Sequence, residues 1–322
     1  MDIPPYWMRV AQDFPMSEIG DEHLRADCPD GITIQAWGWS HVSLAEAEDR
    51  AYDRARKIVQ TASRQGGGKA LYYPTRTIRE QTLQRIRWDG EEIAVITRNR
   101  YFAQVLNTRS LMFVDIDAPE METPDLTMFE WLFNRAQRRK ENAEKRQAQE
   151  TAWLDAQRDY IRMFIAHTPG AGFRVYRTFG GLRLIATDRA YDPLDEATHR
   201  VLDAFGADPL YQRLVRNQTC FRARLTPKHW RMLHDLGRQL RHTPELHFRA
   251  TRDMLTNWSD LDAKRLETFD DWVAVYERLH PDHHATCRYI ETVGPECASA
   301  AHRDLISRHD QLTNAYRDLP LA

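Results

Sequence analysis

The chain has 322 residues, of which 42% are hydrophobic and 29% are charged. These values are ordinary for globular proteins and exclude a collagen-like repeat or a chain that is disordered throughout. Because 45 basic and 47 acidic side chains nearly cancel, a nucleic-acid partner would have to bind a local basic patch. There is no apolar run of the roughly 18–20 residues that span a bilayer, and no basic-then-apolar leader. We therefore expect a cytoplasmic protein without membrane contact.

The N-terminal third contains three kinds of segment. Residues 1–30 show no clear period, which predicts an irregular arm. Residues 31–39 alternate between apolar and polar side chains, as in a half-buried strand. A helical period follows over 44–63 and begins at a capping box, Ser43 to Glu46. The Gly-Gly-Gly-Lys run at 66–69 ends that helix and is interpreted as a turn, because a phosphate loop places its Gly-Lys between a strand and a helix.

Four strands are predicted next, at 82–88, 91–98, 100–106 and 110–117. The first two flank Asp89-Gly90, a strong hairpin signal. The fourth is mostly apolar until it reaches Asp115 and Asp117, so we expect a central strand with its acids at the carboxyl edge of the sheet. A long helix at 127–167 should follow, and its polar middle either faces solvent or contacts a protein partner.

The remainder alternates between strands and helices. Strands are predicted at 173–178, 182–187, 220–226 and 287–293, and helices at 195–205, 208–216, 272–279 and 299–316. The predicted fold class is α+β, with a mixed, largely antiparallel sheet packed against helices and one long, partly solvated helix. After the arm, residues 31–240 should form the main α+β domain. Residues 241–322 form either a C-terminal helical and β subdomain or a continuation of the main domain.

The sharpest chemical feature is the pair Asp115 and Asp117. Residues i and i+2 of a strand point to the same face, roughly 6–7 Å apart. Two carboxylates at that spacing repel each other unless a cation lies between them. Mg²⁺ or Mn²⁺ would suit, because such hard cations combine one or two carboxylates with phosphate oxygens. The alternative is a strand that simply ends in solvent.

A hairpin around Gly180-Gly181 is the second feature. Paired glycines permit a positive φ and a close approach of a ligand to the backbone. Arg177 and Arg183 would then bind a triphosphate, and Asp188 would supply a third catalytic carboxylate. An ordinary glycine hairpin with its arginines in water is the competing interpretation.

A basic strand is the third feature. Arg222 and Arg224 share one face, and Lys228 follows a rigid proline turn. Between residues 219 and 252 there are eight basic and two acidic side chains, with aromatic rings at Trp230, His242 and Phe248 that could stack on bases. The pattern indicates an anionic ligand or a solvated basic face.

In this order, the three features resemble the archaeo-eukaryotic primase superfamily. The matching segments are 113–117, 180–185 and 222–228, within residues 110–230. The resemblance implies a metal-dependent nucleotidyltransferase in which Asp115 and Asp117 hold the metal. The family has a nucleotide-contacting histidine where this chain has Arg183, which implies phosphate binding by a cation and puts catalysis in question.

Two functions follow as expectations. The first is a metal-assisted protein that handles nucleotides or nucleic acid, in the manner of a primase-like nucleotidyltransferase. The second is a non-catalytic nucleic-acid or protein binding module of the same fold, with a protein partner along 127–167. The cysteines show no CxxC spacing and should be free thiols. Zinc is disfavoured at the histidine cluster 280–287, because Pro281 disrupts its geometry.

Overall fold

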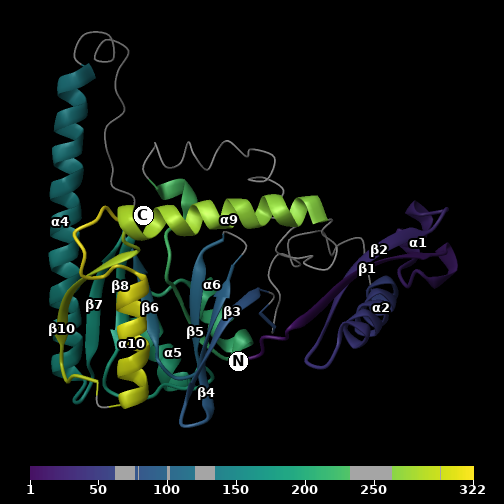
Figure 1. Cartoon of the computed structure of the whole chain (residues 1–322), viewed down its shortest axis with the longest axis horizontal. Helices are drawn as coiled ribbons and strands as arrows, with labels where there is room; N and C mark the ends of the chain where they lie inside the picture. Colours follow the sequence, from purple (N-terminus) through teal and green to yellow (C-terminus); the bar gives the residue numbers. More distant parts are fainter. Residues whose placement is uncertain (62–76, 79, 100–101, 120–134, 233–262, 298) are drawn as a thin grey trace.

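A computed structural model describes residues 1–61, 77–78, 80–99, 102–119, 135–232, 263–297 and 299–322. It has the mixed α+β fold that the sequence predicts, with helices packed around antiparallel sheets (Figure 1). Across these ranges no helix combines the length and the apolar character needed to span a membrane. All four cysteines are unpaired thiols.

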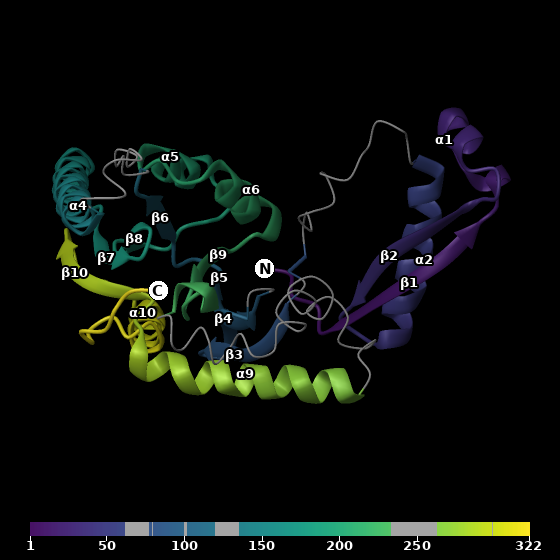
Figure 2. The same cartoon turned by 90° about the horizontal axis from the view of Figure 1, so that it is seen from above.

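A β-hairpin and the helices α1 (Glu22–Asp27) and α2 (Leu44–Thr61) form a separate N-terminal unit, to the right in Figures 1 and 2. Strands β1 (Tyr6–Phe14) and β2 (Ile32–Ser40) pair antiparallel, with the short helix α1 and a 3-10 turn (Met16–Glu18) between them. Helix α2 covers one face of the hairpin. The predicted irregular arm is therefore wrong. Only Val10 and Phe14 of β1 are buried, so the strand shows little alternation of apolar and polar residues. It is held as a strand by its pairing with β2.

The first sheet of the main body has the strand order β3-β4-β5-β9. Its members are β3 (Gln81–Trp88), β4 (Glu91–Arg98), β5 (Gln104–Thr108) and β9 (Phe221–Arg224). The predicted hairpin between β3 and β4 is confirmed. Asp89 and Gly90 have φ values of 48° and 84°, as a tight turn with left-handed residues requires.

The second sheet has the order β10-β7-β8-β6 and carries most of the candidate site. Its members are β6 (Phe113–Asp117), β7 (Phe173–Thr178), β8 (Gly181–Ala186) and β10 (Cys287–Val293). The prediction that β6 is central is wrong, since it is an edge strand of this sheet. Packing from other elements buries its apolar residues, and the Tyr211 hydroxyl donates to the Phe113 carbonyl at 3.0 Å.

Within the described residues, five further helices surround the two sheets. They are α4 (Arg135–His167), α5 (Glu196–Ala204), α6 (Pro209–Gln218), α9 (Ala263–His283) and α10 (Ala300–Leu312), with a 3-10 turn at His229–Arg231. Side chains of the sheets and of these helices share one core, which includes Phe113, Phe173, Leu184, Phe221 and Leu305. Because β10 pairs with β7, the chain from 263 onward continues the main body.

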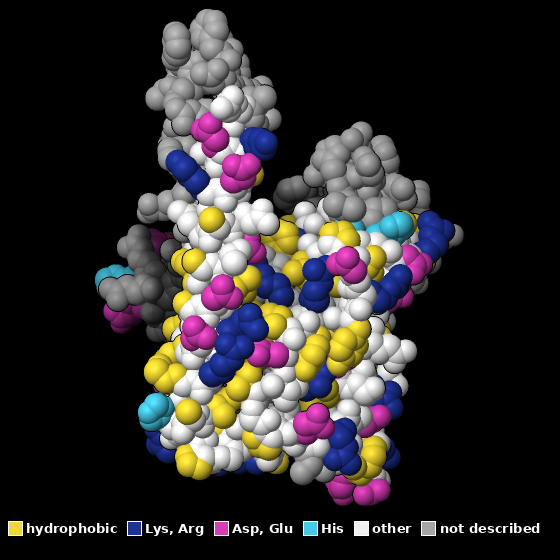
Figure 3. Space-filling view, turned by 90° about the vertical axis from the view of Figure 1, so that its left-hand side faces the viewer, with side chains coloured by type: hydrophobic (Ala, Val, Ile, Leu, Met, Phe, Trp, Pro, Cys, Tyr) yellow, Lys and Arg dark blue, Asp and Glu magenta, His cyan; other side chains and the backbone are white. Residues whose placement is uncertain are grey.

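Helix α4 is the long, partly solvated helix that the sequence predicts. Its C-terminal half contributes Trp153 and Phe164 to the core. Its N-terminal half rises above the body and bears charged side chains of both signs (Figure 3). The predicted capping box at 127–130 lies outside the described residues, as do 66–69, His242 and Phe248.

Candidate functional site

Asp115 and Arg183 form the centre of the candidate site. They face each other across β6 and β8. The Arg183 Nε donates to Asp115 Oδ1 at 2.7 Å, and Nη2 donates to Oδ2 at 3.0 Å. Burial by itself would raise the pKa of Asp115. The charge and hydrogen bonds of the Arg183 guanidinium have the larger effect and lower that pKa. Both carboxylate oxygens are therefore already bound by a cation.

Arg183 is also held from its inner side. Its side chain is 2% exposed, and Nη1 donates to the Arg224 carbonyl at 2.8 Å. Nη1 also lies 3.5 Å from His309 Nε2, while His309 Nδ1 lies 3.0 Å from Asp310 Oδ1. Burial lowers the pKa of His309, which favours the neutral ring, and a hydrogen carried on Nδ1 would be donated to Asp310. A buried polar chain thus runs from Asp115 to Asp310 and fixes Arg183 in place.

Asp117, at the end of β6, is exposed and makes no hydrogen bond or ion pair with any residue that the structure describes. Partial burial, with repulsion from Asp115 and Asp208, raises its pKa. The positive charges of Lys228 and Arg231 by themselves would lower the pKa of Asp117. Both cations therefore lie within electrostatic range of this carboxylate.

Three further cations gather here: Arg224, Lys228 and Arg231. None of them is ion-paired to a carboxylate within the described part of the chain. Burial, followed by repulsion from Arg224 and Arg231, lowers the pKa of Lys228 to about 8. Burial and the charge of Arg183 lower the pKa of Arg224 to about 10, and its Nε is buried without a hydrogen-bond partner among the residues that the structure describes. The cations are crowded and incompletely compensated, and a bound anion would stabilise them.

The glycine hairpin adjoins these cations. A Cβ at Gly180 would lie 4.0 Å from both Arg231 Nη2 and Asp117 Oδ1. Neither Gly180 nor Gly181 has a positive φ, so the turn does not use the conformational freedom that paired glycines permit. Gly181 is instead needed for a close backbone approach: a Cβ there would lie 1.9 Å from the Ile116 carbonyl oxygen.

Two of the predicted phosphate-binding arginines are engaged elsewhere. Arg177 pairs in register with Leu182, so it projects from the opposite face of the sheet to Arg183. It donates to Glu150 of α4 and to the Gly181 carbonyl. Arg222 is held by Glu80, with Nη2 2.6 Å from both carboxylate oxygens. The structure therefore does not bring Arg177 and Arg222 together with the other cations.

Asp188 also lies away from the pair. It follows β8 at the end opposite to Gly181, five residues beyond Arg183, which corresponds to roughly 15 Å of strand. Its oxygens accept from the Tyr191 hydroxyl at 3.2 and 3.1 Å. It is not placed to share a ligand with Asp115 and Asp117.

A divalent metal would meet an incomplete donor set at this site. No group of three or more metal-ligating side chains converges within the described ranges. Asp115 is occupied by Arg183, so of the two predicted metal ligands only Asp117 has carboxylate oxygens without a bonded partner among the described residues. One carboxylate can hold Mg²⁺ only when phosphate oxygens and water complete the shell.

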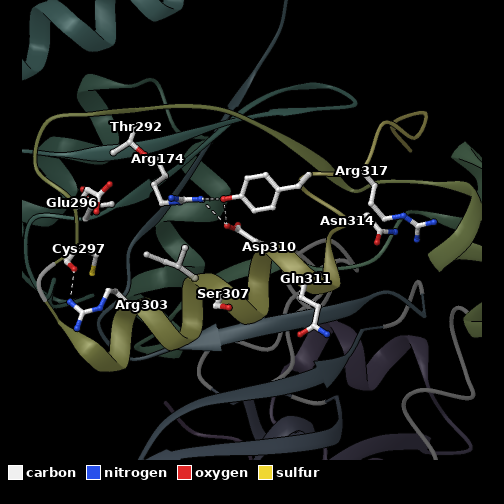
Figure 4. A pocket seen from close by; sticks show the side chains of 13 residues that line it. Arg174, Thr292, Glu296, Cys297, Arg303, Ser307, Asp310, Gln311, Asn314 and Arg317 are labelled. Atoms are coloured by element: carbon white, nitrogen blue, oxygen red, sulfur yellow. Dashed lines mark hydrogen bonds and ion pairs between the residues drawn. The ribbon is translucent and has the colours of Figure 1, made fainter.

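A separate cavity of about 680 Å³ opens beside α10, and Figure 4 shows its lining. Arg174 there donates to Asp310 at 2.8 Å, and the Tyr316 hydroxyl donates to the same Oδ2 at 3.1 Å. None of the residues that the sequence predicts for the site lines this cavity. Through Asp310, it adjoins the far end of the polar chain that starts at Asp115.

The structure adds Arg231 and His309 to the predicted site residues. Arg231 belongs to the basic patch at 219–252, but only the fold places it near Asp117. His309 is brought to Arg183 from α10, 126 positions later in the chain. Its adjacency to Asp310 was the single sequence signal available. Comparisons of the chain with protein-family models, with curated proteins and with solved structures found no match.

Proposed function

We propose that this protein binds the phosphate groups of a nucleotide or nucleic acid, and that binding does not require a divalent metal. The observation that carries the proposal is the group of Arg224, Lys228 and Arg231, which lacks carboxylate partners among the described residues. Crowded cations of this kind repel one another, and a phosphate would relieve that repulsion.

The ion pair of Asp115 with Arg183 supports the metal-independent form of the proposal. In the predicted metal site, a divalent cation would neutralise the two aspartates. In this arrangement a buried guanidinium already neutralises Asp115. Within the resemblance to the archaeo-eukaryotic primase superfamily, this favours the non-catalytic alternative.

Metal-assisted nucleotidyl transfer is the second candidate. It is favoured by Asp117, whose carboxylate has no bonded partner in the described part of the chain and lies near Lys228 and Arg231. A Mg²⁺ or Mn²⁺ ion brought in with a nucleotide would find its protein ligand there. A protein partner along the exposed half of α4 is also still a proposal.

The test is calorimetric titration of the full chain with a nucleoside triphosphate, once with a chelator and once with Mg²⁺. We expect binding in the chelator that weakens about tenfold in Lys228→Ala and in Arg231→Ala, because each removes one phosphate contact. Arg87→Ala is the matched control, since Arg87 is exposed on β3, away from the site.

Three outcomes decide between the candidates. Binding in chelator that depends on Lys228 and Arg231 supports the proposal. Binding that appears only with Mg²⁺ and is lost in Asp117→Asn supports the metal-assisted candidate and overturns metal independence. An absence of binding under both conditions, at millimolar ligand, overturns both.

A further inference from the structure

The tip of the β7–β8 hairpin separates a carboxylate from a guanidinium. A Cβ added at Gly180 would lie 4.0 Å from Asp117 Oδ1 and 4.0 Å from Arg231 Nη2. Apart from the two chain neighbours of Gly180, no other described residue comes within 4 Å of that position. Asp117 and Arg231 nevertheless form no ion pair with each other in the described part of the chain. We call the space between them the Gly180 gap.

Different contacts at the hairpin hold the two sides of the Gly180 gap. Asp117 pairs in register with Gly181 across β6 and β8, which fixes the backbone that carries the carboxylate. The Arg231 guanidinium carbon lies 4.4 Å from the centroid of the Phe179 ring, one position before Gly180. The two opposite charges are therefore held at the hairpin before a ligand arrives, and little ordering is needed when it binds.

Asp117 and Arg231 have opposite hydrogen-bonding capacities, because an ionised carboxylate only accepts hydrogen bonds and a guanidinium only donates them. A ligand group in the Gly180 gap therefore has to offer a donor to Asp117 and an acceptor to Arg231. An ammonium donor is disfavoured, since Lys228 and Arg231 lie within electrostatic range of Asp117 and repel a further cation. A phosphate alone is disfavoured by the negative charge of Asp117. A neutral hydroxyl beside a phosphate meets both requirements.

We propose that Asp117 binds a sugar hydroxyl of the ligand, while Arg224, Lys228 and Arg231 bind its phosphates. This inference rests on the proposed function and narrows its ligand class to nucleoside phosphates with free ribose hydroxyls, either free ribonucleotides or RNA. A ribose hydroxyl both donates and accepts hydrogen bonds, so it suits the Gly180 gap. Asp117 thus determines specificity, because its charge repels an anion that brings no hydrogen-bond donor.

The experiment is calorimetric titration of the full chain in chelator with a ribonucleoside triphosphate, its dideoxy analogue, which lacks both ribose hydroxyls, and inorganic tripolyphosphate. Wild-type protein should bind the ribonucleotide about tenfold more tightly than the dideoxy analogue, because the analogue loses a hydrogen bond to a charged group. In Asp117→Ala that preference should disappear. The same variant should bind tripolyphosphate about twofold more tightly, because a nearby negative charge is removed.

Asp117→Asn separates hydrogen bonding from charge. Its carboxamide keeps an acceptor oxygen and loses the negative charge. This variant should retain part of the preference for the ribonucleotide over the dideoxy analogue. It should also bind tripolyphosphate as tightly as Asp117→Ala does, because both substitutions remove the same charge.

The matched control is Asp208→Asn. The charge of Asp208 raises the pKa of Asp117, so this carboxylate is also within electrostatic range of the site. Its Oδ1 accepts from the Leu210 N–H at 2.8 Å at the start of α6, and asparagine caps a helix as well as aspartate does. The substitution should leave the preference for the ribonucleotide unchanged. Thermal unfolding of every variant shows whether the fold is intact.

The outcomes separate this inference from the proposed function. Equal wild-type affinity for the ribonucleotide and the dideoxy analogue, or a preference that persists undiminished in Asp117→Ala, overturns the hydroxyl contact and leaves phosphate binding standing. Absence of binding of all three probes overturns the proposed function. A further arm uses a short RNA strand: Asp117-dependent binding at least about tenfold tighter than that of the ribonucleotide identifies RNA as the source of the hydroxyl, and equal or weaker binding identifies the free nucleotide.

Discussion

The carboxylate of Asp115 and the guanidinium of Arg183 form a two-point ion pair across β6 and β8, with contacts of 2.7 and 3.0 Å. The pair is asymmetric, because the Asp115 side chain is 47% exposed and that of Arg183 is 2% exposed. The aspartate thus compensates a charge buried in the protein. This reverses the predicted arrangement, in which the aspartate would face an external cation.

The first prediction concerns stability at this pair. Asp115→Asn should lower the free energy of unfolding by about 2–3 kcal/mol, because it leaves a buried guanidinium uncompensated. Asp117→Asn is the matched control and should change it by less than about 0.5 kcal/mol, because Asp117 makes no bond to a described residue. Urea denaturation at pH 7 measures both. Equal effects of the two substitutions would show that the ion pair has no special role.

The second prediction concerns the pH dependence of phosphate binding. The pKa of Lys228 is about 8 in the free protein, and a bound phosphate would raise it. Affinity should therefore be greatest below pH 8 and should decrease as the pH rises through the pKa of the bound state. In Lys228→Arg the cation stays protonated, so the decrease between pH 7.5 and 9.5 should largely disappear. Titration calorimetry across that range checks the prediction, and identical profiles for the two proteins would contradict it.

The third prediction compares two adjacent glycines. Gly181→Ala should lower the free energy of unfolding by about 2–4 kcal/mol, because its Cβ would lie 1.9 Å from the Ile116 carbonyl oxygen and the two strands would have to separate. Gly180→Ala should cost less than about 1 kcal/mol, since its Cβ would make only contacts of 4.0 Å. Chemical denaturation of both variants provides the measurement. A larger loss in Gly180→Ala would mean that the backbone at the hairpin is not as described.

The fourth prediction concerns stability in acid. Burial lowers the pKa of His280 to about 4, below its ordinary value of 6.5. Between those values the unfolded chain binds the proton more readily than the folded chain, so stability falls as the pH falls. This side chain should account for about 2 kcal/mol of lost stability between pH 7 and pH 5. Denaturation of His280→Gln at both pH values should show a smaller loss than the wild type.

The control for that experiment is His283→Gln, because His283 lies on the same helix end and is exposed. In this variant, the free energy of unfolding should fall between pH 7 and pH 5 by the same amount as in the wild type. If the wild type and both variants lose the same free energy of unfolding, His280 does not contribute to acid sensitivity.

Much of the secondary structure could be predicted from local signals. The β3–β4 hairpin follows from Asp89-Gly90, and the observed β7 and β10 coincide with their predicted bounds. The helix starts at Asp195 and Asp208 follow from side chains that accept from the first backbone N–H groups. These signals act over a few residues, so no knowledge of the tertiary fold is needed to interpret them. β1 escaped prediction because its partner residues in β2 lie 18 to 34 positions further along the chain, from Phe14 with Ile32 to Tyr6 with Ser40.

The amino-acid sequence by itself determined the α+β class, most strand and helix positions, and the candidate groups Asp115, Asp117, Arg183, Arg224 and Lys228. Only the tertiary structure decided which of these groups act together. Cross-strand register pairs Asp115 with Arg183 and puts Arg177 on the opposite face. The reason is physical: ionisable groups acquire their roles from neighbours and burial, and contacts such as that between Arg183 and His309 join positions more than 100 residues apart.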